Sequence, residues 1–315
     1  MEYIKNTLKF HVDEPTVITL GKFDGLHRGH ELLMESLHEK CSVNGYKSVV
    51  FTFDMPPRQQ TQGIVGQVIT TNTEKHDIFE QAGIDYLIEC PFTTELMCME
   101  PEAFIAWITR SLTVKCIVVG TDFRFGHNRT GDYKLLQTYA PVYGYEVIVV
   151  NKMQEDGRDI SSTYIREEIQ KGNIKKANHL LGYEYFVKSI VVHGNQIGRT
   201  IGIPTINMIL PEEKLLPPFG VYVTRVMVEE QWFMGVTNVG CKPTIEGKHP
   251  VGVETYIIDF CQNLYDKVIS VQFLDFIRPE MKFPSLDVLK SQMNSDIAQA
   301  QNYFRKLVTI QNHLE

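Results

Sequence analysis

The first half of the chain alternates short apolar runs with longer stretches of helical spacing. The short runs are rich in β-branched residues, whereas apolar residues recur every three or four positions in the stretches between them. Strand candidates cover residues 16–20, 48–53, 85–89, 115–120 and 146–150, and helical segments cover 30–45, 73–83 and 101–112. This alternation predicts an α/β domain in which a doubly wound parallel sheet is connected by crossover helices.

From about residue 186 the strand candidates follow one another without helices between them. They cover residues 186–194, 220–229, 231–240, 251–260 and 267–277, separated by Gly, Pro and polar turns. Consecutive short strands of this kind predict a small antiparallel β-barrel. Apolar residues at steps of three or four from Ser285 to about Ile310 predict a closing amphipathic helix.

The length of 315 residues favours two domains, because a single hydrophobic core seldom grows beyond about 250 to 300 residues. The strand pattern changes across a helical stretch from Tyr164 to Leu181 that ends at Gly182. We therefore expect an N-terminal domain over residues 1–183 and a C-terminal domain over residues 184–315.

Charge and composition narrow the class of protein. A net charge of -7 and a pI near 5.8 argue against a protein that coats nucleic acid. Neither a basic leader nor an apolar run of about 18 residues occurs, so we expect a cytoplasmic protein without membrane contacts. The six cysteines form no CxxC pair and are expected to be buried or idle thiols. The expected partners are small molecules, and the expected state is a monomer or weak homo-oligomer.

The segment GKFDGLHRGH, residues 21–30, lies where a predicted strand runs into a helix. Its glycines allow the backbone to approach a phosphate, and the new helix offers free amide groups. His27 and His30 are three residues apart, so both can reach one phosphoryl group. Because the segment lacks the GK[ST] of a P-loop, chemistry at an α-phosphate is favoured over transfer of a γ-phosphate.

A second polar segment of the first half is Ser161 to Arg166. Its three hydroxyls, Ser161, Ser162 and Thr163, precede a helix, and the guanidinium of Arg166 carries a fork of donors that suits phosphate oxygens. The alternative is an ordinary helix cap followed by a surface arginine.

The second half contains another glycine-rich segment, HGNQIGRTIGIPTIN, residues 193–207. Thr205 and Asn207 are two residues apart in an extended segment and share a face, and their neutral oxygens together with phosphate suit magnesium. Glu254 lies in a predicted strand, on the face opposite its apolar neighbours, and could act as a general base during γ-phosphoryl transfer. The alternatives are a turn before an edge strand and a solvated glutamate.

Both halves resemble known families. GKFDGLHRGH resembles the HxGH motif of nucleotidyltransferases, and more narrowly that of bacterial FAD synthetases; residues 119–132 and the segment ISSTYIREEI, residues 160–169, agree. In the second half GRTIGIPTIN, GVTNVGCKPTIEG and VETYIIDF resemble riboflavin kinase motifs. Over nearly its whole length the chain resembles bifunctional bacterial riboflavin kinase/FAD synthetases. The segment TFDMPPR departs from the family pattern at Met55-Pro56-Pro57.

The resemblance implies that ATP phosphorylates riboflavin to FMN and that a second ATP adenylylates FMN to FAD, with Mg²⁺ as cofactor. It implies catalytic roles for His27, His30 and Arg166 in one reaction and for Glu254 in the other, and magnesium binding by Thr205 and Asn207. The implied nucleotide and flavin contacts are Gly21, Phe23, Asp24, Gly25, Gly29, Asp122, Ser161, Ser162, Thr163, Gly198, Arg199, Gly202 and Arg278. For Arg278, a surface arginine is an equal alternative.

Three other functions are compatible with the same motifs. The chain could retain only one activity, the kinase being favoured because the altered TFDMPPR segment lies in the other half. It could transfer a nucleotidyl group to a different phosphorylated acceptor. It could also be a flavin-binding regulatory or transport-linked protein without turnover.

Overall fold

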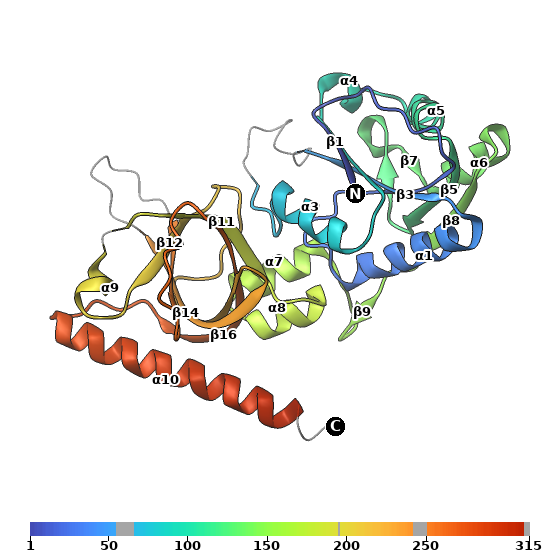
Figure 1. Cartoon of the computed structure of the whole chain (residues 1–315). Coiled ribbons are helices and arrows are strands. Elements are labelled where there is room, and N and C mark those ends of the chain that lie inside the picture. Colours follow the sequence, from blue (N-terminus) through green and yellow to red (C-terminus); the bar gives the residue numbers. More distant parts are fainter. Residues whose placement is uncertain (55–65, 195, 242–250, 312–315) are drawn as a thin grey trace. The chain divides into compact units, whose positions relative to one another are not determined.

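The computed structural model describes residues 1–54, 66–194, 196–241 and 251–311 and contains two compact units, Met1–Ser162 and Thr163–Glu315 (Figure 1). The departure at Met55-Pro56-Pro57 lies outside the described residues. All six cysteines are free; Cys41, Cys90 and Cys116 are buried and the others are exposed. None of the described helices combines the length and the apolar character needed to cross a membrane.

The first unit is built on a six-stranded parallel sheet, which confirms the predicted α/β class. The strand order is β1 (Glu2–Lys5), β4 (Tyr86–Cys90), β3 (Lys47–Phe53), β2 (Thr16–Leu20), β5 (Val114–Gly120) and β8 (Glu146–Val150). All but β1 were predicted. The edge strand β1 is only four residues long and none of its residues is buried, so its hydrophobic pattern gives no strand signal.

Helices cover both faces of this sheet. Helices α1 (Arg28–Asn44) and α3 (Asn72–Gln81) pack on the face that carries Val17 and Val118. Helices α5 (Pro101–Leu112) and α6 (Tyr133–Tyr143) pack on the other face, which carries Ile18. Because the central strands are buried on both sides, their sequences are continuous apolar runs without alternation.

The smaller elements of this unit lie between the main ones. They are α4 (Thr94–Met97), the 3-10 turn η1 (His127–Arg129) and two short antiparallel pairs, β6 (Arg124–Phe125) with β7 (Gly131–Asp132) and β9 (Gln154–Glu155) with β10 (Arg158–Asp159). The strand order reverses at β2, which pairs with β3 on one side and β5 on the other. Ligands of such sheets bind beyond the carboxyl end of the strand at this switch point, where residues 21–30 begin.

The second unit contains a closed six-stranded barrel, as predicted (Figure 1). The antiparallel order is β11 (Phe186–Val192), β12 (Thr205–Ile209), β15 (Val251–Ile257), β14 (Gln231–Cys241), β13 (Gly220–Val228) and β16 (Val268–Pro279). Five of these strands match the predicted ones. The sixth, β12, was expected only as an extended segment, because its five residues follow a glycine-rich turn and the short helix α9 (Ile197–Thr200).

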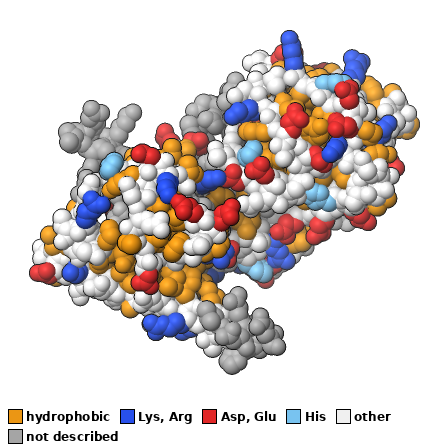
Figure 2. All heavy atoms as spheres, viewed as in Figure 1, with side chains coloured by type: hydrophobic (Ala, Val, Ile, Leu, Met, Phe, Trp, Pro, Cys, Tyr) orange, Lys and Arg blue, Asp and Glu red, His pale blue; other side chains and the backbone are white. Residues whose placement is uncertain are grey.

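Side chains alternate between the interior and the outside of the barrel. Inside, the hydroxyl of Thr237 lies 2.8 Å from those of Thr224 and Thr255, and all three residues are fully buried. Outside, helix α10 (Leu286–Gln311) packs on β13 and β14, with Ala300 buried against Val223. Hydrophobic side chains gather beside this helix on the face seen in Figure 2.

The helical stretch expected from Tyr164 to Leu181 is two helices, so this prediction was wrong in detail. Helix α7 (Ser162–Gln170) ends before Gly172, whose φ of +80° is a left-handed conformation that stops a helix. Helix α8 (Ile174–Leu181) then ends at Gly182 as predicted. Asn178 of α8 donates a hydrogen bond to the carbonyl of Phe273 in β16 (2.8 Å) and so fixes α8 to the barrel.

The hydrogen-bonded hydroxyls of Thr224, Thr237 and Thr255 inside the barrel are expected to stabilise the folded state. Thr237→Val removes the hydroxyl shared by Thr224 and Thr255, and we expect the free energy of unfolding of the barrel to fall by about 1 to 3 kcal/mol. The protein has two tryptophans, Trp107 and Trp232. In a Trp107→Phe background, urea unfolding can therefore be followed by the fluorescence of Trp232 on β14. Thr309→Val, at an exposed position of α10, is the control. An equal midpoint for the two variants would contradict the prediction.

Candidate functional site

The first candidate site is the turn between β2 and α1. Phe23, Gly25 and Leu26 have φ values of +47°, +85° and +33°, so the chain turns through left-handed conformations before the helix. Such a conformation is strained for Phe23, but its ring is buried between those of His30 and Phe79, with centroids 5.2 and 5.5 Å away. Phe23 therefore anchors the turn in the core.

Polar contacts hold the same turn from two directions. The Asp24 carboxylate accepts hydrogen bonds from the amides of Ile69 (2.8 Å) and Thr70 (3.2 Å), just before α3. The Ser162 hydroxyl donates to the carbonyl of Asp24 at 2.7 Å. This bond joins two segments that are 138 residues apart, and it places the start of the ISSTYIREEI segment beside the glycine-rich turn.

The two histidines of the turn stack on one another. Their ring centroids are 3.8 Å apart and the ring planes differ by 21°, so the two imidazoles lie face to face. A Cβ atom at position 29 would lie 3.1 Å from Nδ1 of His27. Glycine between the histidines thus lets the His27 ring lie close against the helix start.

Burial keeps both imidazoles uncharged. It lowers the pKa of His27 to about 4, against smaller opposing effects of the Asp24 and Asp122 carboxylates. Burial, and then the charge of His27, lower the pKa of His30 well below its ordinary value. Among the described residues, neither Nδ1 atom has a hydrogen-bond partner, although both are buried. Neutral imidazoles at neutral pH can act as hydrogen-bond donors towards phosphate oxygens.

A lysine that no sequence motif singled out pairs with two carboxylates of this unit. Lys152, which follows β8, places its ammonium 3.1 Å from a carboxylate oxygen of Asp122 and 3.0 Å from one of Asp159. It links the loop after β5 to the β9–β10 pair. Ser161 precedes α7, whereas Thr163 and Arg166 lie on that helix. The remaining predicted glycines, Gly21 and Gly25, lie in the turn itself.

The second candidate site lies on the outer surface of the barrel. Asn207 of β12 pairs with Glu254 of β15, and Glu254 pairs on its other side with Asn238 of β14. Side chains of directly paired residues lie on the same face of a sheet. Thr205, two residues before Asn207, also lies on this face. The shared face predicted for Thr205 and Asn207 is confirmed, and Glu254 joins it.

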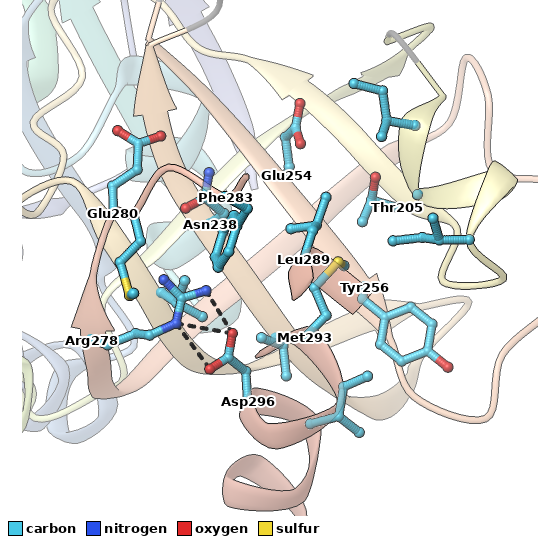
Figure 3. A pocket seen from close by; sticks show the side chains of 17 residues that line it. Thr205, Asn238, Glu254, Tyr256, Arg278, Glu280, Phe283, Leu289, Met293 and Asp296 are labelled. Carbon is cyan, nitrogen blue, oxygen red and sulfur yellow. Dashed lines mark hydrogen bonds and ion pairs between the residues drawn. The ribbon is translucent and has the colours of Figure 1, made fainter. Parts of the chain in front are cut away.

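A pocket of about 270 Å³ opens on this face beneath α10 (Figure 3). Strand residues supply most of its polar side chains, whereas α10 supplies the apolar Leu289 and Met293 and the carboxylate of Asp296. The lining residues with polar side chains are Thr205, Asn238, Glu254, Tyr256, Arg278, Glu280 and Asp296. Of these, Thr205, Glu254 and Arg278 were predicted from the sequence as site residues.

Arg278 is neither solvent-exposed nor unpaired. Its guanidinium contacts both carboxylate oxygens of Asp296 on α10, at 2.8 to 3.1 Å, and Asp296 is buried. Such a two-pronged pair is a strong form of ion pair. Arg278 therefore ties α10 to the end of β16 and lines the pocket at the same time (Figure 3).

The glycine-rich segment of this unit borders the same pocket. Gly198 of α9 lines it, and a Cβ atom there would lie 2.3 Å from the carbonyl oxygen of Ile203. No side chain fits at that distance, so this position requires glycine. Arg199 is exposed, with its guanidinium 3.4 Å from the Gln196 side chain, and Gly202 has a φ of +81°.

The second site offers oxygen donors for magnesium. Within the described residues, no group of three or more His, Cys, Asp or Glu side chains is arranged to hold a metal ion. Mg²⁺, however, commonly takes one or two protein oxygens and completes its shell with water and substrate phosphates. The Thr205 hydroxyl, the Asn207 amide and the nearby Glu254 carboxylate fit that manner of binding.

Comparisons with known proteins cover both units. A family model described as FAD synthetase matches residues 9–164, and one described as riboflavin kinase matches residues 181–304. The bifunctional riboflavin kinase/FMN adenylyltransferase of Listeria monocytogenes is 33% identical over 293 residues, covering 92% of this chain and 93% of the relative. The protein of the same name from Escherichia coli K12 is 35% identical, with 92% and 93% covered.

A solved structure is also similar over almost its entire length. It is described as a macrolide-efflux protein from Streptococcus pneumoniae and has 31% sequence identity and a TM-score of 0.86. The match covers 96% of this chain and 99% of that one.

The depressed histidine pKa values predict how the stability of the first unit depends on pH. Between about pH 4 and 6.5 the unfolded chain binds more protons than the folded one, so stability falls as the pH is lowered through that range. From pH 7.5 to 5.0 we expect His27 alone to remove about 2 kcal/mol. The free energy of unfolding of the first unit at each pH can be measured by urea unfolding, followed by the fluorescence of Trp107 in a Trp232→Phe background.

His27→Gln should flatten this pH dependence, because glutamine does not titrate. His11→Gln is the control for the loss of an exposed imidazole. The prediction fails if His27→Gln and the parent protein lose the same stability between pH 7.5 and 5.0.

Proposed function

The chain belongs to the family of bifunctional riboflavin kinase/FMN adenylyltransferases, and we propose that the pocket beneath α10 is its kinase site and the turn after β2 its adenylyltransferase site. The protein phosphorylates riboflavin to FMN and adenylylates FMN to FAD. One observation carries the assignment of the kinase site: Glu254, the only carboxylate in its row of paired residues, lies beside Asn207 at the wall of a pocket.

In the proposed kinase reaction, the terminal ribityl hydroxyl of riboflavin attacks the γ-phosphorus of ATP. The Glu254 carboxylate accepts the proton of that hydroxyl as the new oxygen–phosphorus bond forms, and ADP leaves. The backbone around Gly198 and Gly202 borders the nucleotide, together with Arg199. Magnesium held by Thr205 and Asn207 would offset negative charge on the phosphate oxygens.

In the proposed adenylyl transfer, the phosphate of FMN attacks the α-phosphorus of a second ATP and pyrophosphate leaves. No general base is needed, because the FMN phosphate is already ionised at neutral pH. The uncharged imidazoles of His27 and His30 donate hydrogen bonds to oxygens that gain charge in the transition state. Arg166 adds a guanidinium, while Asp122 and the hydroxyls of Ser161 and Thr163 contact the nucleotide. Asp24 and Ser162 hold the turn through their own hydrogen bond.

Three further proposals concern the division of the chain, its location and oligomeric state, and its partners. The compact units divide after Ser162, whereas we place the functional division after Tyr183, so that residues 1–183 carry adenylyl transfer and residues 184–315 carry the kinase. The enzyme works in the cytoplasm on small-molecule substrates, as a monomer or weak homo-oligomer. Its net charge of -7 supports the view that nucleic acid is not a partner.

Glu254→Gln tests the kinase site. The amide keeps the shape of the side chain but cannot accept the hydroxyl proton, so we expect FMN formation to fall by about 10² to 10⁴. FMN-to-FAD conversion should be unchanged. Chromatography of the flavins formed from riboflavin and MgATP over time measures both. Glu212→Gln, at an exposed position of the same unit, is the control. Loss of both activities in Glu254→Gln would contradict separate sites.

His27→Ala and His30→Ala test the adenylyltransferase site. Removal of one transition-state donor should lower FAD formation from FMN by about 10² to 10³ in each variant, with FMN formation from riboflavin retained. The readout is the rate of FAD production at saturating ATP. A variant that makes FAD at the parent rate would remove that histidine from the mechanism.

A further inference from the structure

Asn238 belongs to the GVTNVGCKPTIEG segment and lines the proposed kinase pocket, but the sequence predicted no role for it. It lies on β14 directly opposite Glu254 of β15, and Glu254 lies directly opposite Asn207 of β12. Three polar side chains from three neighbouring strands therefore form a row across the outer face of the barrel. Glu254 is the central member, and Asn238 flanks it on the side away from β12.

The Asn238 amide is available to a ligand. It lines the pocket and is only partly buried, and Figure 3 shows it in the pocket wall with Glu254 on the adjacent strand. Among the described residues, its side chain makes no hydrogen bond. A side-chain amide that faces a pocket without a protein partner can give both its donor and its acceptor to a bound molecule.

The pocket lining combines two kinds of side chain. Phe283, Leu289 and Met293 are apolar, whereas Thr205, Asn238 and Glu254 supply polar groups. A flavin has a flat ring system and a chain of hydroxyl groups. Each hydroxyl donates one hydrogen bond and accepts others, and this pattern matches an amide better than a carboxylate, which only accepts.

We propose that Asn238 binds a hydroxyl of the ribityl chain, next to the hydroxyl that reacts, and that it thereby selects the substrate and holds the reacting oxygen towards Glu254. This inference rests on the proposed kinase site. It makes Asn238 a specificity-determining residue, because a substrate that lacks the bound hydroxyl would leave the amide unpaired in the pocket.

The test compares the full-length parent enzyme and Asn238→Ala on riboflavin and on analogues that lack one ribityl hydroxyl each, at the 2′, 3′ or 4′ position. The quantity measured is kcat/KM for phosphorylation. We expect the parent to discriminate against one analogue by at least about tenfold. The Asn238→Ala substitution should lower kcat/KM for riboflavin by a similar factor. For that analogue, the substitution should lower kcat/KM only slightly relative to the parent enzyme, so the two losses do not add.

Three controls separate the possible explanations. Gln231→Ala removes an exposed amide from the same strand outside the pocket and should leave kcat/KM unchanged. FMN-to-FAD conversion reports on folding of the other unit. If Asn238 only oriented Glu254, Asn238→Ala would lower kcat/KM for all the flavins equally and shift the acid limb of the pH–rate profile; the proposal expects that limb to stay in place.

An equal loss on every analogue, or no loss on riboflavin, would overturn the role of Asn238. These results would not contradict the proposed kinase site, provided that Glu254→Gln lowers FMN formation as expected. An active Glu254→Gln variant would instead overturn the site itself, and with it the basis for the inference.

Discussion

The register of three barrel strands decides what the second unit can bind. Side chains alternate across a strand, so the pairing of β12, β15 and β14 places Asn207, Glu254 and Asn238 on the outer face and Thr237 and Thr255 on the inner face. A slip of one residue would bury a carboxylate among hydroxyls and apolar side chains. The closed barrel prevents such a slip, because each strand is paired on both sides.

The two candidate sites differ in the charge of their functional side chains. In the barrel, the Glu254 carboxylate lies at the wall of a pocket, and the proposed reaction there requires a hydroxyl to lose a proton. In the parallel sheet, burial removes charge from two stacked imidazoles, so that they can act as neutral donors. The difference suits the two nucleophiles, because an alcohol needs a base and a phosphate monoester is already an anion. In the proposed assignment, each unit thus supplies the kind of group that its substrate needs.

Helix α10 contributes to the proposed kinase pocket through one ion pair. Arg278 at the end of β16 contacts the buried carboxylate of Asp296, and this pair holds the helix against the barrel. The apolar side chains of α10 then complete the pocket lining. Arg278 was expected either near the flavin or at the surface, and the structure shows an arginine that organises the pocket wall.

The sequence by itself determined the class of each unit and the segments that carry the chemistry. Hydrophobic periodicity is local, so it predicted five strands of the parallel sheet, five strands of the barrel and the closing helix. It could not predict β1 or β12, which are too short to show a period, or the break at Gly172 between two good helices. Only the tertiary structure decided which distant residues meet: Ser162 with Asp24, Arg278 with Asp296, and Asn238 with Glu254. The physical reason is that strand pairing and burial depend on contacts across the fold, which the spacing of residues along one segment does not encode.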